Sequence, residues 1–424
     1  MKACVVAVGS ELLTPFRVDT NSLVITEKLN AIGCEVRLKA VVGDDAHELA
    51  SVLETALGFA DLVVCTGGLG PTQDDITRDT VARVLEMPLV LDETIEERLR
   101  QRFARRGLTM AEINRRQAMV PLGAIALENL NGTAPGLWID RGDVAVLLLP
   151  GPPREMGPIL DHVVTEYLAP KAGGTRLFRR VLKITGRTES DVDATAQPVY
   201  TRWLTRTVPI STTILASLGQ IELHLTAASS AEDEARVGLD EAVRELQAAL
   251  GTSVYSSDGS ALEDVVGHLL RGRGLTVAAA ESCTGGLLTS RLTDVPGSSA
   301  YVERAAVCYS NRSKVELLGV SESVLDAHGA VSEPVALAMA AGIRAAAGAD
   351  VGIGVTGIAG PGGGTPEKPV GTVAIAVVTP WEEKVLVFWF PGSRDQVKGQ
   401  ATQAALNMVR LLLQKAQRGV AKRP

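Results

Sequence analysis

The chain has 424 residues, which exceeds the usual size of a single hydrophobic core, so two or three domains are expected. Its composition, 46% hydrophobic and 21% charged, is typical of a globular protein and excludes a disordered or fibrous one. The formal net charge of −7 and the scattered Lys and Arg residues argue against broad nucleic-acid binding.

The cysteines and the apolar segments predict a cytoplasmic protein. The five cysteines are odd in number and widely spaced within apolar runs, a pattern typical of reduced thiols. No apolar run reaches the roughly 18 residues of a membrane span, and the stretch Ala3–Val8 lacks the features of a signal peptide. Neither a CxxC nor an HExxH pattern is present, which gives a zinc site little support. A homodimer is the expected oligomeric state.

Residues 1–170 alternate short apolar runs with amphipathic ones. Continuous Val, Leu and Ile runs separated by helices predict an α/β domain with a parallel sheet covered on both faces. The expected strands are Ala3–Val8, Glu35–Val41, Leu62–Thr66 and Val144–Leu149, and the expected helices are Thr20–Leu29, Ala46–Leu57 and Ile76–Leu85.

The segment GGLGPTQDDITRDT (Gly67–Thr80) follows an expected strand and leads into an expected helix. Glycine amides and a helix amino terminus suit a phosphate group. Asp74 and Asp75 would repel that phosphate unless a divalent cation such as Mg²⁺ bridged them, which predicts metal-assisted pyrophosphate chemistry. The alternative is that Thr72 or Asp74 only caps the helix. A Rossmann dinucleotide site is rejected because the GxGxxG spacing is absent.

Residues 171–257 predict a small α+β module that joins the two larger domains. An amphipathic strand pair is expected at Arg179–Thr185 and Ile221–Ala227, followed by a charged helix at Glu232–Leu250. Clusters of Gly, Ser and Asp mark both boundaries of the module. No residue pattern in this module indicates chemistry.

Residues 258–424 return to alternating strands and helices, which predicts a second α/β domain with a mainly parallel sheet. The expected strands are Thr276–Ala280, Val302–Tyr309, Val351–Val355, Gly371–Val378 and Lys384–Phe390, and the expected helices are Leu262–Arg271, Gly286–Thr293, Glu333–Ala347 and Arg394–Lys415.

In AAESCTGGLL (Ala279–Leu288) a strand ends at Glu281 and Ser282 before a helix begins. A hydroxyl at such a turn is exposed above the sheet, and the amides that follow it point toward an oxyanion formed there. Ser282 is therefore a candidate nucleophile, and the alternative is a helix-capping serine.

A nucleophilic serine needs a base, and no histidine has a motif that recommends it. CYSNRSKVELLGV (Cys308–Val320) places Tyr309 at a strand end and Lys314 near the start of a short helix. Lysine acts as a base only when its pKa falls from about 10.4, and Ser-Lys pairs are a known variant of the catalytic triad. The loop Gly354–Val373 has six glycines between Gly354 and Gly364, so its amides could wrap a nucleotide phosphate.

Four segments of the first domain resemble the molybdopterin-binding-like domain of the CinA (competence/damage-inducible) family: Gly9–Ser22, the GGLGPTQDDIT segment, Asn129–Gly136 and Leu148–Met156. The resemblance implies metal-dependent hydrolysis of ADP-ribose to AMP and ribose 5-phosphate, with Asp74 and Asp75 at the metal. A molybdopterin-like binding role without catalysis stays open. The pocket implied by the resemblance is lined by Ser10, Glu11, Asn21, Gly67, Gly68, Thr72, Asp74, Asp75, Asn131, Gly132, Thr133 and Gly151.

The three segments of the second site, with Val295–Ala305 and Ala327–Pro334, resemble the CinA carboxy-terminal domain, whose known activity is nicotinamide mononucleotide deamidation. The resemblance implies that Ser282 attacks the carboxamide carbon, Lys314 accepts and returns the proton, Tyr309 assists, and no cofactor is needed. Cys283 is a rival nucleophile. A scaffold for DNA uptake or repair proteins is the alternative function. The implied contacts are Thr284 and Gly285 for the oxyanion, and Thr356, Gly357, Gly360 and Arg394 for the substrate.

Overall fold

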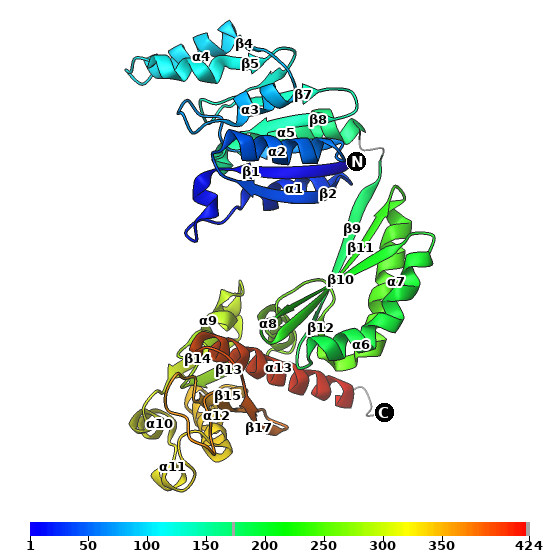
Figure 1. Ribbon diagram of the computed structural model, residues 1–424. Coiled ribbons are helices and arrows are strands. Elements are labelled where there is room, and N and C mark those ends of the chain that lie inside the picture. The colour runs from blue at the N-terminus through cyan, green and yellow to red at the C-terminus, as the bar shows by residue number, and fades with distance from the viewer. Residues whose placement is uncertain (172–173, 421–424) are drawn as a thin grey trace. The chain divides into compact units, whose positions relative to one another are not determined.

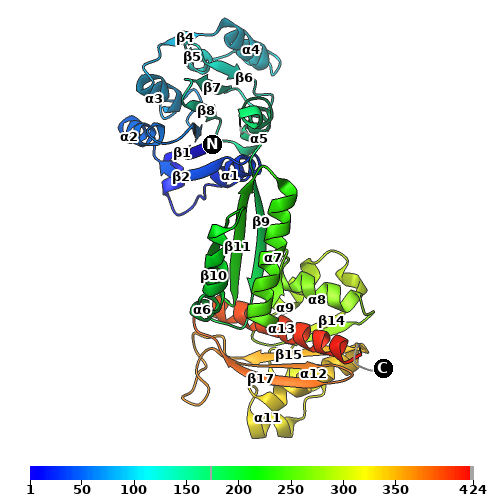
Figure 2. The same ribbon diagram turned by 90° about the vertical axis from the view of Figure 1, so that its right-hand side faces the viewer.

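The computed structural model describes residues 1–171 and 174–420, with side chains described as far as residue 416. The chain separates into two compact units, Met1–Phe178 with Ala228–Arg236, and Arg179–Ala227 with Val237–Pro424. Both contain α/β layers, as predicted (Figures 1 and 2). Within the described ranges, no helix is long and apolar enough to cross a membrane.

The first unit is built on a six-stranded sheet in the order β2-β1-β3-β8-β7-β6. The first four strands of this order are parallel, and β7 and β6 are antiparallel to their neighbours. The sequence predicted the parallel core because β1, β3 and β8 are mostly apolar runs, whereas β7 and β6 were not predicted. The strands are β1 (Lys2–Val8), β2 (Glu35–Val42), β3 (Leu62–Thr66), β6 (Ile125–Leu127), β7 (Gly136–Asp140) and β8 (Ala145–Leu149).

Helices cover both faces of this sheet because successive side chains of a strand point to opposite sides. Val5 of β1 packs in one buried cluster with residues of α1 and α5, while its neighbour Val6 packs in the opposite cluster with residues of α2 and α3. Asp45 caps α2 by accepting hydrogen bonds from the amides of His47 and Glu48. The helices are α1 (Asn21–Ala31), α2 (Ala46–Leu57), α3 (Thr77–Val84) and α5 (Pro153–Val163).

Two groups of short elements extend this unit and were not predicted. A two-stranded ladder of β4 (Leu89–Leu91) and β5 (Met119–Pro121) accompanies α4 (Glu93–Ala104) and the 3₁₀ segment η2 (Glu112–Ala118). Strands of three residues are too short to carry a recognisable alternation. The remaining short helical segments are η1 (Ser10–Leu13), η3 (Val164–Leu168) and η4 (Ala169–Lys171).

The middle of the chain forms a four-stranded sheet in the order β10-β11-β9-β12. It has the α+β character that the sequence predicted, and α7 (Glu232–Leu250) has the predicted bounds. The hairpin partner β10 was not predicted, because its exposed face interrupts the apolar pattern. The other elements are β9 (Arg176–Ile184), α6 (Glu189–Tyr200), η5 (Thr201–Thr205), β10 (Ile210–Ser217), β11 (Gln220–Ser229), η6 (Gly251–Ser253) and β12 (Val254–Ser256).

The last part of the chain contains a mixed five-stranded sheet in the order β14-β13-β15-β16-β17. Strands β14, β13 and β15 are parallel, and β16 and β17 are added antiparallel at one edge. All five were predicted within a few residues of their ends. The strands are β13 (Val277–Glu281), β14 (Val302–Val307), β15 (Val351–Gly357), β16 (Thr372–Val378) and β17 (Glu383–Trp389).

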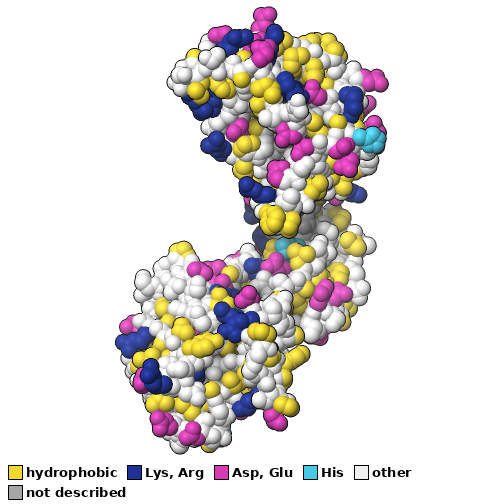
Figure 3. All heavy atoms as spheres, turned by 60° about the vertical axis from the view of Figure 1, so that its left-hand side comes forward, with side chains coloured by type: hydrophobic (Ala, Val, Ile, Leu, Met, Phe, Trp, Pro, Cys, Tyr) yellow, Lys and Arg dark blue, Asp and Glu magenta, His cyan; other side chains and the backbone are white. Residues whose placement is uncertain are grey.

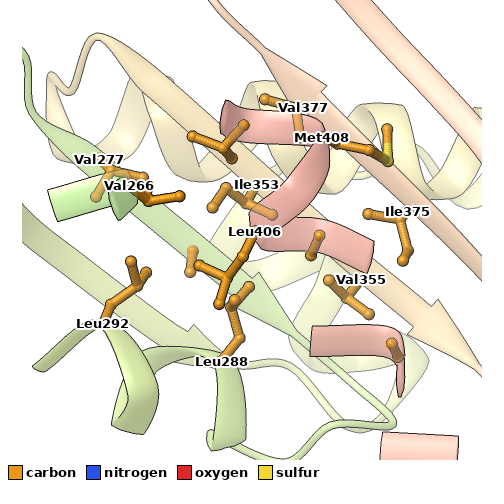
Figure 4. Packing of buried hydrophobic residues seen from close by; sticks show 14 of the residues in the cluster. Val266, Val277, Leu288, Leu292, Ile353, Val355, Ile375, Val377, Leu406 and Met408 are labelled. Atoms are coloured by element: carbon orange, nitrogen blue, oxygen red, sulfur yellow. The ribbon is translucent and has the colours of Figure 1, made fainter. Parts of the chain in front are cut away.

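Two groups of helices cover the two faces of this sheet. On one face α8 (Leu262–Arg271), α9 (Leu287–Asp294) and α13 (Arg394–Val420) bury a large apolar cluster against the strands, part of which is drawn in Figure 4. On the other face, α12 (Glu333–Ala347) lies against the sheet with the short helices α10 and α11 beside it. Val351, Ile353 and Val355 of β15 pack in the first cluster, while Gly352 and Gly354 between them face α12. The short helices are η7 (Ser298–Ala300), α10 (Asn311–Leu318) and α11 (Glu322–His328).

The close packing of α12 on β15 depends on a glycine, and replacing Gly354 with Ala is expected to destabilise this unit. A methyl group on Gly354 would lie 2.3 Å from the Ala336 carbonyl oxygen and 2.7 Å from the Ala340 amide nitrogen. Overpacking of this kind costs about 1–3 kcal/mol. Thermal unfolding should show a lowered transition temperature. Gly362→Ala is the matched control because no heavy atom lies within 4 Å of its added methyl group, and an equal shift in both variants would contradict the argument.

Charged side chains are mixed over the surface. On the face drawn in Figure 3, Lys and Arg side chains alternate with Asp and Glu over both units. A surface of this kind supplies little of the long, single-sign field that guides a polyanion to a protein.

Candidate active sites

Ser282 lies immediately after β13, on the turn that leads into α9. Its amide donates to the Val355 carbonyl of β15 at 2.9 Å, which continues the sheet pairing by one residue. Gly285 (φ 62°) and Gly286 (φ 94°) then take left-handed conformations that reverse the chain into the helix. The serine is therefore held at the carboxyl edge of the sheet, as predicted from the strand-to-helix pattern.

The carboxylate of Glu281 stabilises this turn by accepting hydrogen bonds. It is fully buried and accepts hydrogen bonds from the amides of Gly286, Leu288 and Thr289 at 2.8–3.1 Å, and from the Thr289 hydroxyl at 2.5 Å. These are the amides at the start of α9, where a carboxylate is stabilised by the helix dipole. Sequence reasoning missed this role, although an acid directly before the serine and the glycine pair was visible.

The side chain of Lys314 enters the site from α10, on the neighbouring strand-to-helix connection. Ser310 caps α10 by accepting a hydrogen bond from the Ser313 amide, and this start places Lys314 in the first turn. The lysine is 1% exposed, and its Nζ lies 3.2 Å from Ser282 Oγ. The structure therefore brings together the two residues predicted as nucleophile and base.

The remaining contacts of Lys314 Nζ are two backbone carbonyls, of Cys308 at 2.9 Å and of Tyr309 at 3.3 Å. Burial lowers the pKa of Lys314 below 10.5, because the charged form loses its hydration. A neutral amine has two hydrogens and one lone pair. If the neutral form donated both hydrogens to the carbonyls, its lone pair would face Ser282 Oγ, which is the orientation a base needs.

Cys283 is in a poor position to act as the nucleophile. The residue is 5% exposed, and burial raises the pKa of its thiol to about 12. The thiol therefore stays protonated near neutral pH, and only the thiolate is strongly nucleophilic. This favours Ser282 over its neighbour.

The turn also offers donors for a developing oxyanion. In the part of the chain that the structure describes, the amides of Cys283 and Thr284 have no acceptor, and neither does the buried Thr284 hydroxyl. The Gly285 amide, by contrast, donates to the Ser282 carbonyl at 3.2 Å. Of the two residues expected at the oxyanion, Thr284 therefore has the free donors, and Gly285 provides the turn.

Arg394, at the start of α13, contacts two of the remaining predicted residues, Gly360 and Tyr309. It donates to the Gly360 carbonyl and to the Tyr309 hydroxyl, both at 2.8 Å. The Tyr309 side chain is exposed and contacts Arg394, while only its backbone carbonyl contacts Lys314.

The other two predicted substrate contacts, Thr356 and Gly357, lie at the end of β15. Thr356 is buried, and its hydroxyl donates to the Ala330 carbonyl at 2.8 Å. Gly357 closes β15, where a methyl group would lie 2.7 Å from the Val373 side chain.

The first unit contains a separate cavity of about 610 Å³ at the carboxyl ends of its parallel strands. Asn21 connects two walls of this cavity, because its amide group donates to the Thr66 hydroxyl at 3.0 Å and to the Gly151 carbonyl at 2.7 Å. Eight of the residues expected here line the cavity: Glu11, Asn21, Gly67, Gly68, Asp74, Asp75, Thr133 and Gly151.

The two aspartates play different parts in this cavity. Asp75 closes its own loop, because its carboxylate accepts from the Gly70 amide at 2.7 Å, the Thr72 amide at 2.8 Å and the Thr72 hydroxyl at 2.5 Å. Asp74 is exposed beside it on the cavity wall. Helix α3 begins only at Thr77 with no side-chain cap, so the alternative that Thr72 or Asp74 caps it is wrong.

Four of the expected residues lie outside the lining of this cavity. Ser10 exchanges hydrogen bonds with Asp44, Thr72 bonds to Asp75, and Asn131 donates to the Arg154 carbonyl. Gly132 lines a second cavity of about 390 Å³, beside α4. Sequence reasoning missed several polar residues that do line the larger cavity: Arg17, Asp19, Asp44, Gln117 and Glu155.

A preformed metal centre is not seen in the described residues, which contain no group of three or more His, Cys, Asp or Glu side chains placed to hold a metal ion. The larger cavity still has carboxylates on several walls, from Glu11, Asp19, Asp44, Asp74 and Glu155. Oxygen donors of this kind suit a hard divalent cation that takes its other ligands from a bound phosphate.

Comparisons with known proteins match the two ends of the chain to two different family models. A family model described as "CinA C-terminal domain" matches residues 259–413, and one described as "Probable molybdopterin binding domain" matches residues 4–170. A CinA-like protein of Acidobacterium capsulatum is 44% identical over 97% of this chain and 99% of its own length. A putative competence-damage inducible protein of Symbiobacterium thermophilum is 47% identical, with the same coverage of both chains. The crystal structure of CinA from Thermoplasma acidophilum, 35% identical, covers 38% of this chain and 96% of that one with a TM-score of 0.36. The chain belongs to the CinA family, with a molybdopterin-binding-like domain followed by a CinA carboxy-terminal domain.

Proposed function

We propose that the carboxy-terminal part of the chain hydrolyses the carboxamide of nicotinamide mononucleotide, giving nicotinate mononucleotide and ammonia. The observation that carries the proposal is the contact of 3.2 Å between Lys314 Nζ and Ser282 Oγ, with the two other contacts of Nζ made to carbonyls. A buried lysine amine within hydrogen-bond distance of a serine hydroxyl, with its pKa lowered by burial, is suited to acyl transfer.

The reaction follows in two halves. Ser282 Oγ attacks the carboxamide carbon while its proton moves to Lys314 Nζ, and the free amides of Cys283 and Thr284 donate to the oxyanion. Lys314 then returns this proton to the leaving nitrogen, which departs as ammonia and leaves an ester on Ser282. Water attacks the ester with Lys314 again as the base, and the proton finally returns to Ser282. No redox partner is needed.

The direct experiment is to incubate the full-length protein with nicotinamide mononucleotide and to measure ammonia and nicotinate mononucleotide. Equal amounts of the two products are expected. Release of free nicotinamide without ammonia would indicate cleavage of the glycosidic bond and would overturn the proposal, and so would the absence of any product.

A second function, hydrolysis of ADP-ribose to AMP and ribose 5-phosphate, is supported by the carboxylate-lined cavity of the first unit. Asp74 is the residue best placed to hold a divalent cation such as Mg²⁺, because the oxygens of Asp75 already accept hydrogen bonds within the loop. When bound, the cation would neutralise the charge of a pyrophosphate. Gly67 and Gly68 also line the cavity, and without side chains they let a ligand come close to the backbone.

The contrast between the two aspartates gives a prediction for this second function. Asp74→Ala should abolish AMP formation from ADP-ribose and Mg²⁺ and leave thermal stability unchanged, because Asp74 is exposed. Asp75→Ala should also lower stability, by about 1–3 kcal/mol, because it leaves the loop amides of Gly70 and Thr72 without acceptors. AMP formation by the Asp74 variant at the normal rate would exclude Asp74 as a ligand. Absence of AMP from the wild-type protein with any divalent ion would favour a molybdopterin-like binding module.

A further inference from the structure

A second lysine, Lys398, lies beside the turn that carries Ser282. Lys398 is half-buried in the second turn of α13, and a methyl group placed on Gly285 would lie 3.9 Å from its Nζ. Among the described residues, this Nζ makes no hydrogen bond and no ion pair. A partly buried ammonium group that has no partner raises the free energy of the folded protein. An anionic ligand bound next to Gly285 would offset this cost.

Arg394 lies on the same face of α13, because residues four apart in a helix are neighbours. Its two hydrogen-bond acceptors, the Gly360 carbonyl and the Tyr309 hydroxyl, are uncharged and hold the guanidinium between the glycine-rich loop and the Tyr309 loop. A guanidinium has five N–H donors, so three remain available after these contacts.

The turn that carries Ser282 has no free carboxylate to neutralise the charge of Arg394 or Lys398. Glu281 is the carboxylate nearest in sequence to the nucleophile, and its two oxygens already accept four hydrogen bonds from residues 286–289. In the described part of the chain, no ion pair joins Arg394 or Lys398 to a carboxylate. Two unpaired cations one helical turn apart form a site for a doubly charged anion.

We propose that Lys398, together with Arg394, binds the phosphate monoester of the nucleotide substrate and so makes the enzyme select a nucleotide over the nucleoside. The inference rests on the proposed deamidation and names the residue that recognises the phosphate. The placement of the two lysines supports it: Lys314 Nζ contacts Ser282 Oγ, and Lys398 Nζ lies beside Gly285, three residues further along the same turn.

The test compares nicotinamide mononucleotide with nicotinamide riboside, which has the same carboxamide and no phosphate. Lys398→Met should lower kcat/KM for the mononucleotide about ten- to one-hundredfold, mainly through KM, and leave kcat/KM for the riboside unchanged. Lys398→Arg should restore most of the loss. Lys415→Met is the matched control, because Lys415 lies on the same helix and pairs with the surface residue Glu382.

Equal losses on both substrates would overturn the proposal and would place Lys398 at the carboxamide or in the fold. Binding provides a readout that needs no turnover. In a Ser282→Ala background, calorimetry with nicotinamide mononucleotide should show weaker binding when Lys398 is also replaced by Met. Absence of ammonia from the wild type with weakened binding in this variant would reject the deamidation and keep the phosphate site, and unchanged binding would reject the phosphate site itself.

Discussion

Replacement of Ser282 by Ala is expected to reduce ammonia release from nicotinamide mononucleotide by about a thousandfold or more, because it removes the atom that forms the ester. Within residues 1–171 and 174–420, the Ser282 side chain makes one hydrogen bond, with Lys314, so the fold should tolerate the change. Steady-state ammonia release and thermal unfolding, measured side by side, check both parts of the expectation.

The neighbouring cysteine supplies the control. Cys283→Ala should retain activity within a few-fold, since the buried thiol has its pKa raised to about 12 and is not ionised near neutral pH. A burst of one equivalent of ammonia at the start of the reaction, present in this variant and absent from Ser282→Ala, would show directly that the ester forms on the serine. Activity that survives in Ser282→Ala and disappears in Cys283→Ala would reverse the assignment.

The strands that could be predicted from the sequence are those that are buried on both faces of a sheet. Strands such as β3 and β8 are buried on both faces, so every residue except Thr66 is apolar and the pattern stands out. Strand β10 (ISTTILAS) carries Ser or Thr on both faces and leaves Leu215 exposed, so it has no clear apolar alternation. The three-residue strands β4 and β5 gain their order from pairing with each other. The missed strands depend on tertiary partners, which a local pattern does not contain.

The candidate catalytic pair could be predicted because both residues follow strands of one parallel sheet, whose carboxyl ends meet at a single edge. The supporting residues could not be predicted in the same way. Lys398 is one polar residue on a long helix, and only the crossing of α13 over the sheet brings it to Gly285. The role of Asp75 depends on a loop that folds back five residues to Gly70, whereas the sequence pattern favoured a helix start.

Replacement of Lys314 by Met is the second change with a large expected effect, because it removes the base and preserves most of the side-chain volume. General-base removal typically costs about 10²–10⁴-fold in rate, so ammonia release should fall by this range while binding of nicotinamide mononucleotide persists. Lys314→Arg should be as inactive as Lys314→Met, because a guanidinium does not give up its proton. An active arginine variant would show that a positive charge, and not a base, is required at this position.

The same lysine links activity and stability to pH with a definite sign. Burial lowers the pKa of Lys314 in the folded protein below 10.5, so between that lowered pKa and 10.5 the unfolded chain binds a proton that the native protein does not. The free energy of unfolding of the wild type therefore falls as pH falls through this window, and Lys314→Met lacks this contribution. Chemical unfolding across the window should show the difference in stability moving in favour of the variant at lower pH. Over the same window the rate of ammonia release by the wild type should stay level, and it should decline as pH falls through the lowered pKa, where the folded protein's amine takes up its proton. A stability difference that does not change with pH, together with a flat rate profile, would mean that Lys314 keeps its charge in the folded protein and cannot accept the proton of Ser282.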